Sequence, residues 1–132
     1  MIGVDTNVLV RYFTEDDAAQ TPLAVRFIEG TLGAENKGHV SLVTLAELVW
    51  VLRSRFAAQV AEISTAVMHL LSDARFAVQD ESAAWLALDL YQQDGVDLSD
   101  ALIAAVNRLH GCTHTVTFDD KATRIPDMKL LG

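Results

Sequence analysis

Acidic residues stand beside apolar segments at four widely separated places. Asp5 follows MIGV, Glu47 lies in TLAELVWVL, Asp100 lies in DLSDALIAAV, and Asp119 follows TVTF. A charge among apolar residues is costly unless a cation shares its surroundings. Carboxylate oxygens are the ligands that Mg²⁺ and similar hard cations prefer. If the fold gathers these four side chains, we expect a divalent-metal site of the kind that hydrolyses phosphodiesters.

Asp5 and Glu47 each have a structural alternative. Asp is a favoured N-cap, so Asp5 can cap a helix that starts near Asn7. Thr44 and Glu47 have the spacing of a capping box, in which the Glu bonds back to the cap backbone. The apolar neighbours of Glu47, such as Trp50, favour a functional role, since a solvent-facing capping residue does not need them.

The acids of the C-terminal half have similar alternatives. Asp97 can be an N-cap and Asp100 a first-turn acid, both favoured by the helix dipole. We rank Asp100 as the ligand and Asp97 as a cap or auxiliary ligand. Asp119 and Asp120 also fit an ordinary turn. Asp119 is preferred because it is nearer the strand end, and the choice between the two stays open. Polar neighbours expected to orient the ligands by hydrogen bonds are Thr6, Asn7 and Thr117.

The elements that must position these acids alternate between strands and helices. This pattern predicts a three-layer α/β/α fold, with a mainly parallel sheet of four or five strands. Ligands of such sheets bind beyond the carboxyl ends of the strands, where Asp5 and Asp119 fall. No repeat or linker divides the chain, so a single domain over residues 1–132 is predicted. Strands are expected at 1–4, 39–42, 76–78, 113–118 and 128–131, and helices at 7–13, 15–32, 44–56, 59–71, 82–92 and 97–110.

Composition limits the classes of function. The chain is 51% hydrophobic and has a net charge of −8, which counts against non-specific binding of nucleic acid. Part of this negative charge belongs to the expected metal ligands, and a bound cation would neutralise it. No apolar run reaches the roughly 18 residues that cross a membrane, and no signal leader is recognised. The chain has one cysteine, Cys112, which is expected in the core because free cysteines are usually buried. A single cysteine cannot form an internal disulfide, so the chain is predicted to be cytoplasmic.

The segments VDTNVLVRYF, TLAELVWVL, DLSDALIAA and TFDD together resemble PIN-domain proteins. Within that family they are most similar to VapC-type ribonuclease toxins of prokaryotic toxin–antitoxin systems. The segments occur in the family's order and span nearly the whole chain. The resemblance implies a Mg²⁺- or Mn²⁺-dependent endoribonuclease with a catalytic, metal-binding quartet at Asp5, Glu47, Asp100 and Asp119. Asp97 is a frequent extra carboxylate in this family.

The resemblance also implies partners. RNA is the expected substrate, a homodimer the expected assembly, and a small antitoxin the expected inhibitor, which alone contacts DNA. The RNA target cannot be derived from the sequence. Several cations are candidate phosphate contacts, although an ordinary solvated side chain is the favoured interpretation of each: Arg11, Arg53, Arg55, Lys121 and Arg124.

Two other classes of protein share part of this pattern. A receiver-like signalling domain also has strand-end aspartates, but it needs adjacent acids after the first strand, where Asp5 stands alone. A covalent phosphatase needs a second Asp at the position of Asn7. A PIN-like or receiver-like binding or regulatory module without nuclease activity remains the alternative. The four histidines show no zinc-ligand spacing, so histidine chemistry is not expected.

Overall fold

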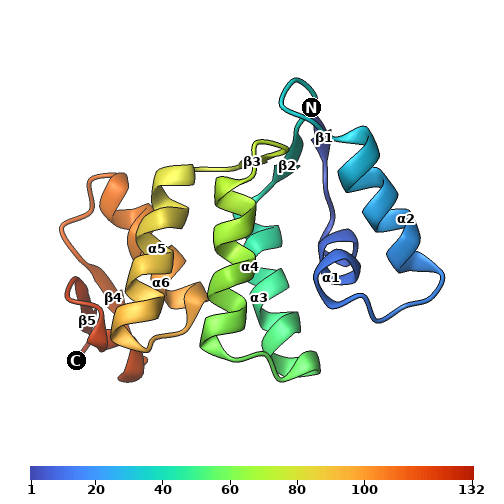
Figure 1. Ribbon diagram of the computed structural model, residues 1–132. Helices are drawn as coiled ribbons and strands as arrows, with labels where there is room; N and C mark the ends of the chain where they lie inside the picture. Colours follow the sequence, from blue (N-terminus) through green and yellow to red (C-terminus); the bar gives the residue numbers. More distant parts are fainter. The chain divides into compact units, whose positions relative to one another are not determined.

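The computed structural model describes residues 1–132, which form two compact units. Unit 1 runs from Met1 to Gln79 and unit 2 from Asp80 to Gly132. Each unit has its own parallel strands and helices (Figure 1).

Unit 1 contains a three-stranded parallel sheet in the order β1-β2-β3. Gly38 pairs with Ile2 on one side and with Phe76 on the other. A Cβ atom at Gly38 would lie 2.8 Å from Leu32 and 2.9 Å from Val4, so this close approach requires glycine. The elements are β1 (Ile2–Gly3), α1 (Thr6–Thr14), α2 (Gln20–Arg26), the π-helical turn η1 (Phe27–Thr31), β2 (Gly38–Val40), α3 (Leu42–Phe56), α4 (Val60–Ser72) and β3 (Phe76–Val78).

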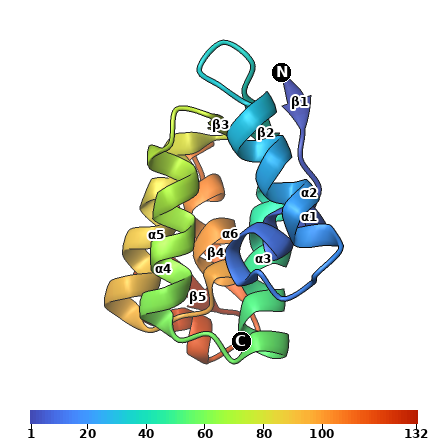
Figure 2. The same cartoon turned by 45° about the vertical axis from the view of Figure 1, so that its right-hand side comes forward.

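The helices of unit 1 are placed by their apolar stripes. Helix α1 packs against both α2 and α3 (Figure 2), and α4 packs against α3 and β3. Fully buried Leu9 of α1 and Leu45 and Leu48 of α3 contribute to the core. Spacings of three and four residues place such side chains on one helix face. The same helices therefore present their opposite faces to solvent.

Unit 2 pairs two helices with a two-stranded parallel sheet. Helix α5 packs along α6, whose buried Ala101, Ala104 and Ala105 allow close approach. The guanidinium of Arg108 donates to both carboxylate oxygens of Asp127, at 3.1 and 2.6 Å, and so ties α6 to the loop before β5. The elements are α5 (Glu81–Asp94), α6 (Leu98–Leu109), β4 (Thr115–Thr117), the 3₁₀ turn η2 (Lys121–Arg124) and β5 (Met128–Leu130).

The predicted α/β class is confirmed: five strands occur where the sequence places them, and every strand pairing is parallel. Their hydrogen bonds form one ladder of three strands and one of two. The expectation that Cys112 lies in the core is wrong, because it is exposed in the loop between α6 and β4. No helix combines the length and apolarity needed to cross a membrane.

Candidate functional site: two groups of carboxylates

Asp5 stands between β1 and α1 and caps the helix. Its backbone is extended, and its Oδ1 accepts a hydrogen bond from the Thr6 N–H at 2.9 Å. The predicted capping role is therefore confirmed. Only one carboxylate oxygen is engaged, so Asp5 can cap α1 and still offer Oδ2 to a cation. Thr6, 3% exposed, anchors this turn in the interior.

Glu47 lies in the second turn of α3, on the exposed surface of unit 1. The predicted capping box is wrong. Ser41 is the N-cap of α3, and its Oγ accepts the Thr44 N–H at 3.1 Å. Glu47 is six residues beyond that cap, so its carboxylate has no helix end to satisfy. Capping therefore no longer explains Glu47.

A hollow of about 400 Å³ in unit 1 contains the Glu47 side chain. Thr6 and Asn7 line it from α1, next to Asp5 in the chain. The polar residues predicted to assist at this end of the site, Thr6 and Asn7, are thus beside Glu47. They add a hydroxyl and an amide to a hollow that also has apolar walls, such as Val51 and Phe56.

The carboxylates of unit 2 form a second group. Asp97 is the N-cap residue of α6, and Asp100 is half-buried in its first turn. Burial raises the pKa of Asp100, and the negative charges of Asp97 and then Asp119 raise that pKa further. The fold therefore brings three of the predicted acids near enough to repel one another.

Asp119 is held in place by its neighbours. Its backbone N–H donates to Thr117 Oγ1 at 3.0 Å, and its Oδ1 accepts the Lys121 N–H at 2.9 Å. Thr117 therefore supports this acid, as its position predicts. The negative charge of Asp119 raises the pKa of the Asp100 carboxyl, whereas Asp120 does not contribute to that rise. The electrostatics favour Asp119 as the acid of this group.

The donor chemistry suits a hard divalent cation. All the candidate ligands are carboxylates, and the mutual repulsion around Asp100 is the field that a cation would neutralise. Within neither unit are three Asp, Glu, His or Cys side chains gathered closely enough to form a complete metal cage. Mg²⁺ suits such an open set, because it usually keeps several water ligands.

Trp50 and Arg55 share the hollow of Glu47, and neither was predicted as a site residue. Arg55 was named only as one of several possible phosphate contacts, and Trp50 only as an apolar neighbour. Trp50 and Val51 lie three and four residues after Glu47, and Arg55 lies four residues after Val51, so each step joins neighbours on the surface of the helix. This spacing was the signal in the sequence.

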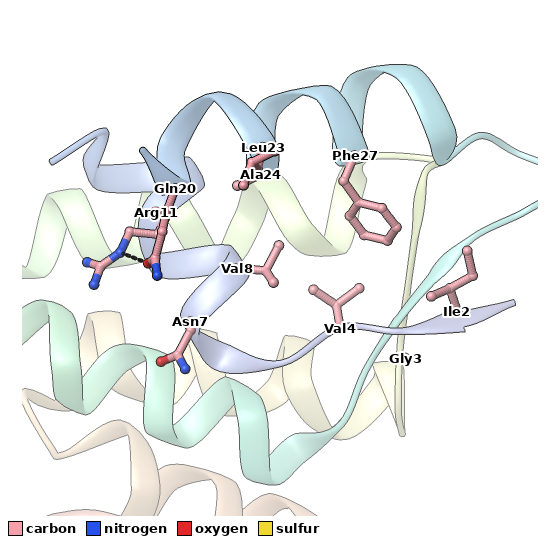
Figure 3. A pocket seen from close by; sticks show the side chains of 10 residues that line it. All are labelled: Ile2, Gly3, Val4, Asn7, Val8, Arg11, Gln20, Leu23, Ala24 and Phe27. Atoms are coloured by element: carbon pink, nitrogen blue, oxygen red, sulfur yellow. Dashed lines mark hydrogen bonds between the residues drawn. The ribbon is translucent and has the colours of Figure 1, made fainter. Parts of the chain in front are cut away.

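A second hollow, of about 460 Å³, lies between β1, α1 and α2 and is mainly apolar. Figure 3 shows Val4, just after β1, Val8 of α1 and Phe27, the first residue of η1, pointing into the same space. The Arg11 Nε donates to Gln20 Oε1 at 2.8 Å at one end of it. Leu23, 60% exposed, extends the apolar surface at its edge.

Comparison with protein families gives one match. The family described as PIN domain matches residues 2–128, a range that includes all four predicted acids and parts of both units. No curated protein matches the chain.

Proposed function

This chain belongs to the PIN-domain family, whose members are typically nucleases, and we propose that it is a metal-dependent endoribonuclease. The observation that carries the proposal is that Asp100 is half-buried at the start of α6, where Asp97 and Asp119 add negative charge beside it. A half-buried carboxylate beside other negative charges is costly to ionise unless a cation binds next to it. The proposed reaction is hydrolysis of an RNA phosphodiester bond.

We propose that Asp5, Glu47, Asp100 and Asp119 together hold Mg²⁺ or Mn²⁺. The bound metal would supply an activated water and neutralise charge that develops on the phosphate. Two of these ligands have a fixed orientation: Asp5 is held by its bond to the Thr6 N–H, and Asp119 by its bonds to Thr117 and Lys121. A raised pKa means that Asp100 gains more than an ordinary carboxylate when a cation relieves its repulsion.

Asp97 and Asn7 would complete the site without being primary ligands. Asp97 adds negative charge next to Asp100, and Asn7 offers an amide beside Glu47. Both can position waters and the phosphate through hydrogen bonds. The products expected by family analogy carry 5′-phosphate and 3′-hydroxyl ends.

We further propose that the protein is the toxin of a toxin–antitoxin pair and acts as a cytoplasmic homodimer. The apolar hollow between α1 and α2 supports a protein partner, because a mainly apolar groove with an exposed Leu23 suits an apolar segment. A basic antitoxin would complement the net charge of −8. DNA contact would then belong to the antitoxin.

Cleavage of a labelled single-stranded RNA by the purified protein tests the nuclease proposal. We expect cleavage with Mg²⁺ or Mn²⁺, none with EDTA, and recovery when metal is restored. Asp100→Asn should lower the cleavage rate by more than about 100-fold, since even residues that only orient metal ligands typically contribute 10–100-fold. Asp94→Asn, the same change at the end of α5, is the matched control. Wild-type cleavage by Asp100→Asn would refute the proposal.

A further inference from the structure

A third hollow of unit 1 lies where α1 and α3 end and α4 begins. It has a volume of about 720 Å³ and is lined only by these three helices and the loop residues beside them. Pockets of roughly 300–1,000 Å³ are the usual size for small-molecule ligands. None of the four predicted acids lines this hollow, so it is a candidate site separate from the proposed metal ligands.

Aromatic rings form part of the wall. The rings of Tyr12 and Phe13, in the last turn of α1, meet edge to face with their centroids 5.5 Å apart. The Phe13 ring is also perpendicular to the His69 ring of α4, at 5.6 Å. Phe56, 37% exposed, adds a further ring from the end of α3. The faces of such rings attract organic cations.

The threonines and acids of the hollow present oxygen atoms that can accept hydrogen bonds. The Thr14 hydroxyl already donates to the Val10 carbonyl at 2.7 Å, and the Thr65 hydroxyl donates to the Ala61 carbonyl at 2.9 Å. The Glu15 carboxylate makes no hydrogen bond or ion pair. No Lys or Arg lines the hollow. A ligand that supplies donors and positive charge is therefore the chemical complement of these groups.

Helix ends add to the negative charge. Both α1 and α3 have their C-terminal ends here, and such ends carry partial negative charge. Glu15 is the C-cap residue of α1, where an acid is repelled by the helix, and its φ of 52° is one that glycine adopts more easily. Glu62 offsets the positive end of α4, and only its Oε1 is engaged, by the Gln59 N–H at 3.0 Å. A bound cation would turn the repulsion at Glu15 into attraction.

We propose that this hollow binds a linear polyamine, with its alkyl chain against the aromatic rings and its ammonium groups at Glu15 and Glu62. Aromatic rings and carboxylates without a basic side chain are suited to organic cations. Two carboxylates on different helices match a ligand with more than one ammonium group, whereas a lysine side chain of a protein partner supplies one. The inference does not depend on the proposed nuclease function, because the hollow contains none of the proposed metal ligands.

Isothermal titration calorimetry with spermidine, in EDTA and without RNA, tests the inference. We expect saturable binding of one spermidine per chain. Butylamine has a similar alkyl chain but one ammonium group, so it should bind at least about threefold more weakly, since an exposed ion pair typically contributes up to roughly fivefold. The uncharged analogue butanediol should not bind.

Single substitutions test each contact. Glu15→Gln and Glu62→Gln should each raise the Kd for spermidine about threefold, because each removes one ion pair. Glu62→Gln keeps the helix cap, since glutamine also fits a capping box. Phe56→Leu should raise Kd about threefold, the value of an exposed cation–π contact. Glu35→Gln removes the same charge from the exposed turn before β2 and should leave Kd unchanged.

Three outcomes would each overturn the inference. No saturable binding, or an equal loss in Glu35→Gln and Glu15→Gln, would mean only diffuse attraction to a chain of net charge −8. Butylamine binding as tightly as spermidine would indicate a single-ammonium ligand such as a partner's lysine. Weaker binding in Asp100→Asn but not in Glu15→Gln would place the polyamine among the predicted metal ligands. Should Phe56→Leu fail to fold, the exposed Glu15→Gln and Glu62→Gln still decide the result.

Discussion

Asp119 and Asp120 have the same side chain one residue apart but differ in their surroundings. Asp119 is fixed by Thr117 and Lys121 and acts on Asp100, while Asp120 is the N-cap residue of η2. We expect Asp119→Asn to lower RNA cleavage by more than about 100-fold. Asp120→Asn should retain activity within a few-fold, and the initial rates of the two variants provide the measurement. The reverse result would move the fourth ligand to Asp120.

Asp100 should oppose folding at neutral pH when metal is absent. Its pKa is raised in the folded state, so its contribution to stability is present at low pH and is lost as pH rises through that pKa. Asn cannot lose a proton. The melting temperature of Asp100→Asn relative to wild type, measured in EDTA, should therefore be higher at about pH 7 than at about pH 4.

Asp127 provides a control of opposite sign for that measurement. The Arg108 guanidinium lowers the pKa of Asp127, so this carboxylate stabilises the fold above about pH 4 and loses that effect as pH falls. Asp127→Asn should destabilise the protein more at neutral than at acidic pH. Equal pH profiles for the Asp100 and Asp127 variants would contradict the electrostatic account of Asp100.

At the level of elements, the start of α3 determines where Glu47 and Trp50 project. Ser41→Ala removes the cap bond to Thr44 and should lower the free energy of unfolding by about 1 kcal/mol. Ser54→Ala is the matched control in the same helix. Its hydroxyl donates to the Trp50 carbonyl on the exposed surface, and its loss should change stability by less than about 0.5 kcal/mol. Urea unfolding measures both, and equal losses would argue against the cap.

Most elements could be predicted from the sequence, because their signals are local. Asp97 at the start of α6 and the apolar runs of the strands are such signals. The start of α3 was predicted at Thr44 because Ser41 and Thr44 are both good cap residues, and only the backbone distinguishes them. Cys112 was misplaced because residue type says little about burial in a loop. How strands divide into ladders depends on contacts between distant residues, which no local pattern encodes.

At the candidate site, residue type was a better guide to the acids than position in the chain was to the other residues of the site. Asp97 and Asp119 act electrostatically on Asp100, while the convergence of Asp5 and Glu47 with these acids stays a prediction. Trp50 was missed because apolar residues occur all round α3, and no local pattern separates an exposed aromatic residue from a core one. The exposed face of an apolar helix becomes visible only when the core face is known, as Leu48 and Val49 define it here.

At the scale of the whole molecule, the nuclease proposal requires Asp5 of unit 1 and Asp100 of unit 2 to serve the same reaction. If they do, either substitution removes the function that both share. Effects of residues that act as one catalytic group are strongly non-additive. We therefore expect the double variant Asp5→Asn/Asp100→Asn to cleave RNA about as slowly as the slower single variant. The logarithms of independent losses would instead add.

Metal binding shared by Asp5 and Asp100 can be tested without measuring catalysis. A ligand that binds only the folded state stabilises it by about 2.7 kcal/mol at 100 times its Kd. Mn²⁺ should therefore raise the melting temperature of the wild type, and both Asp5→Asn and Asp100→Asn should reduce that rise. Asp94→Asn should show the full rise, because it keeps the proposed ligands. If Mn²⁺ stabilised Asp5→Asn as much as wild type while Asp100→Asn lost the effect, the metal would belong to the acids of unit 2 alone, and Asp5 would be only the cap of α1.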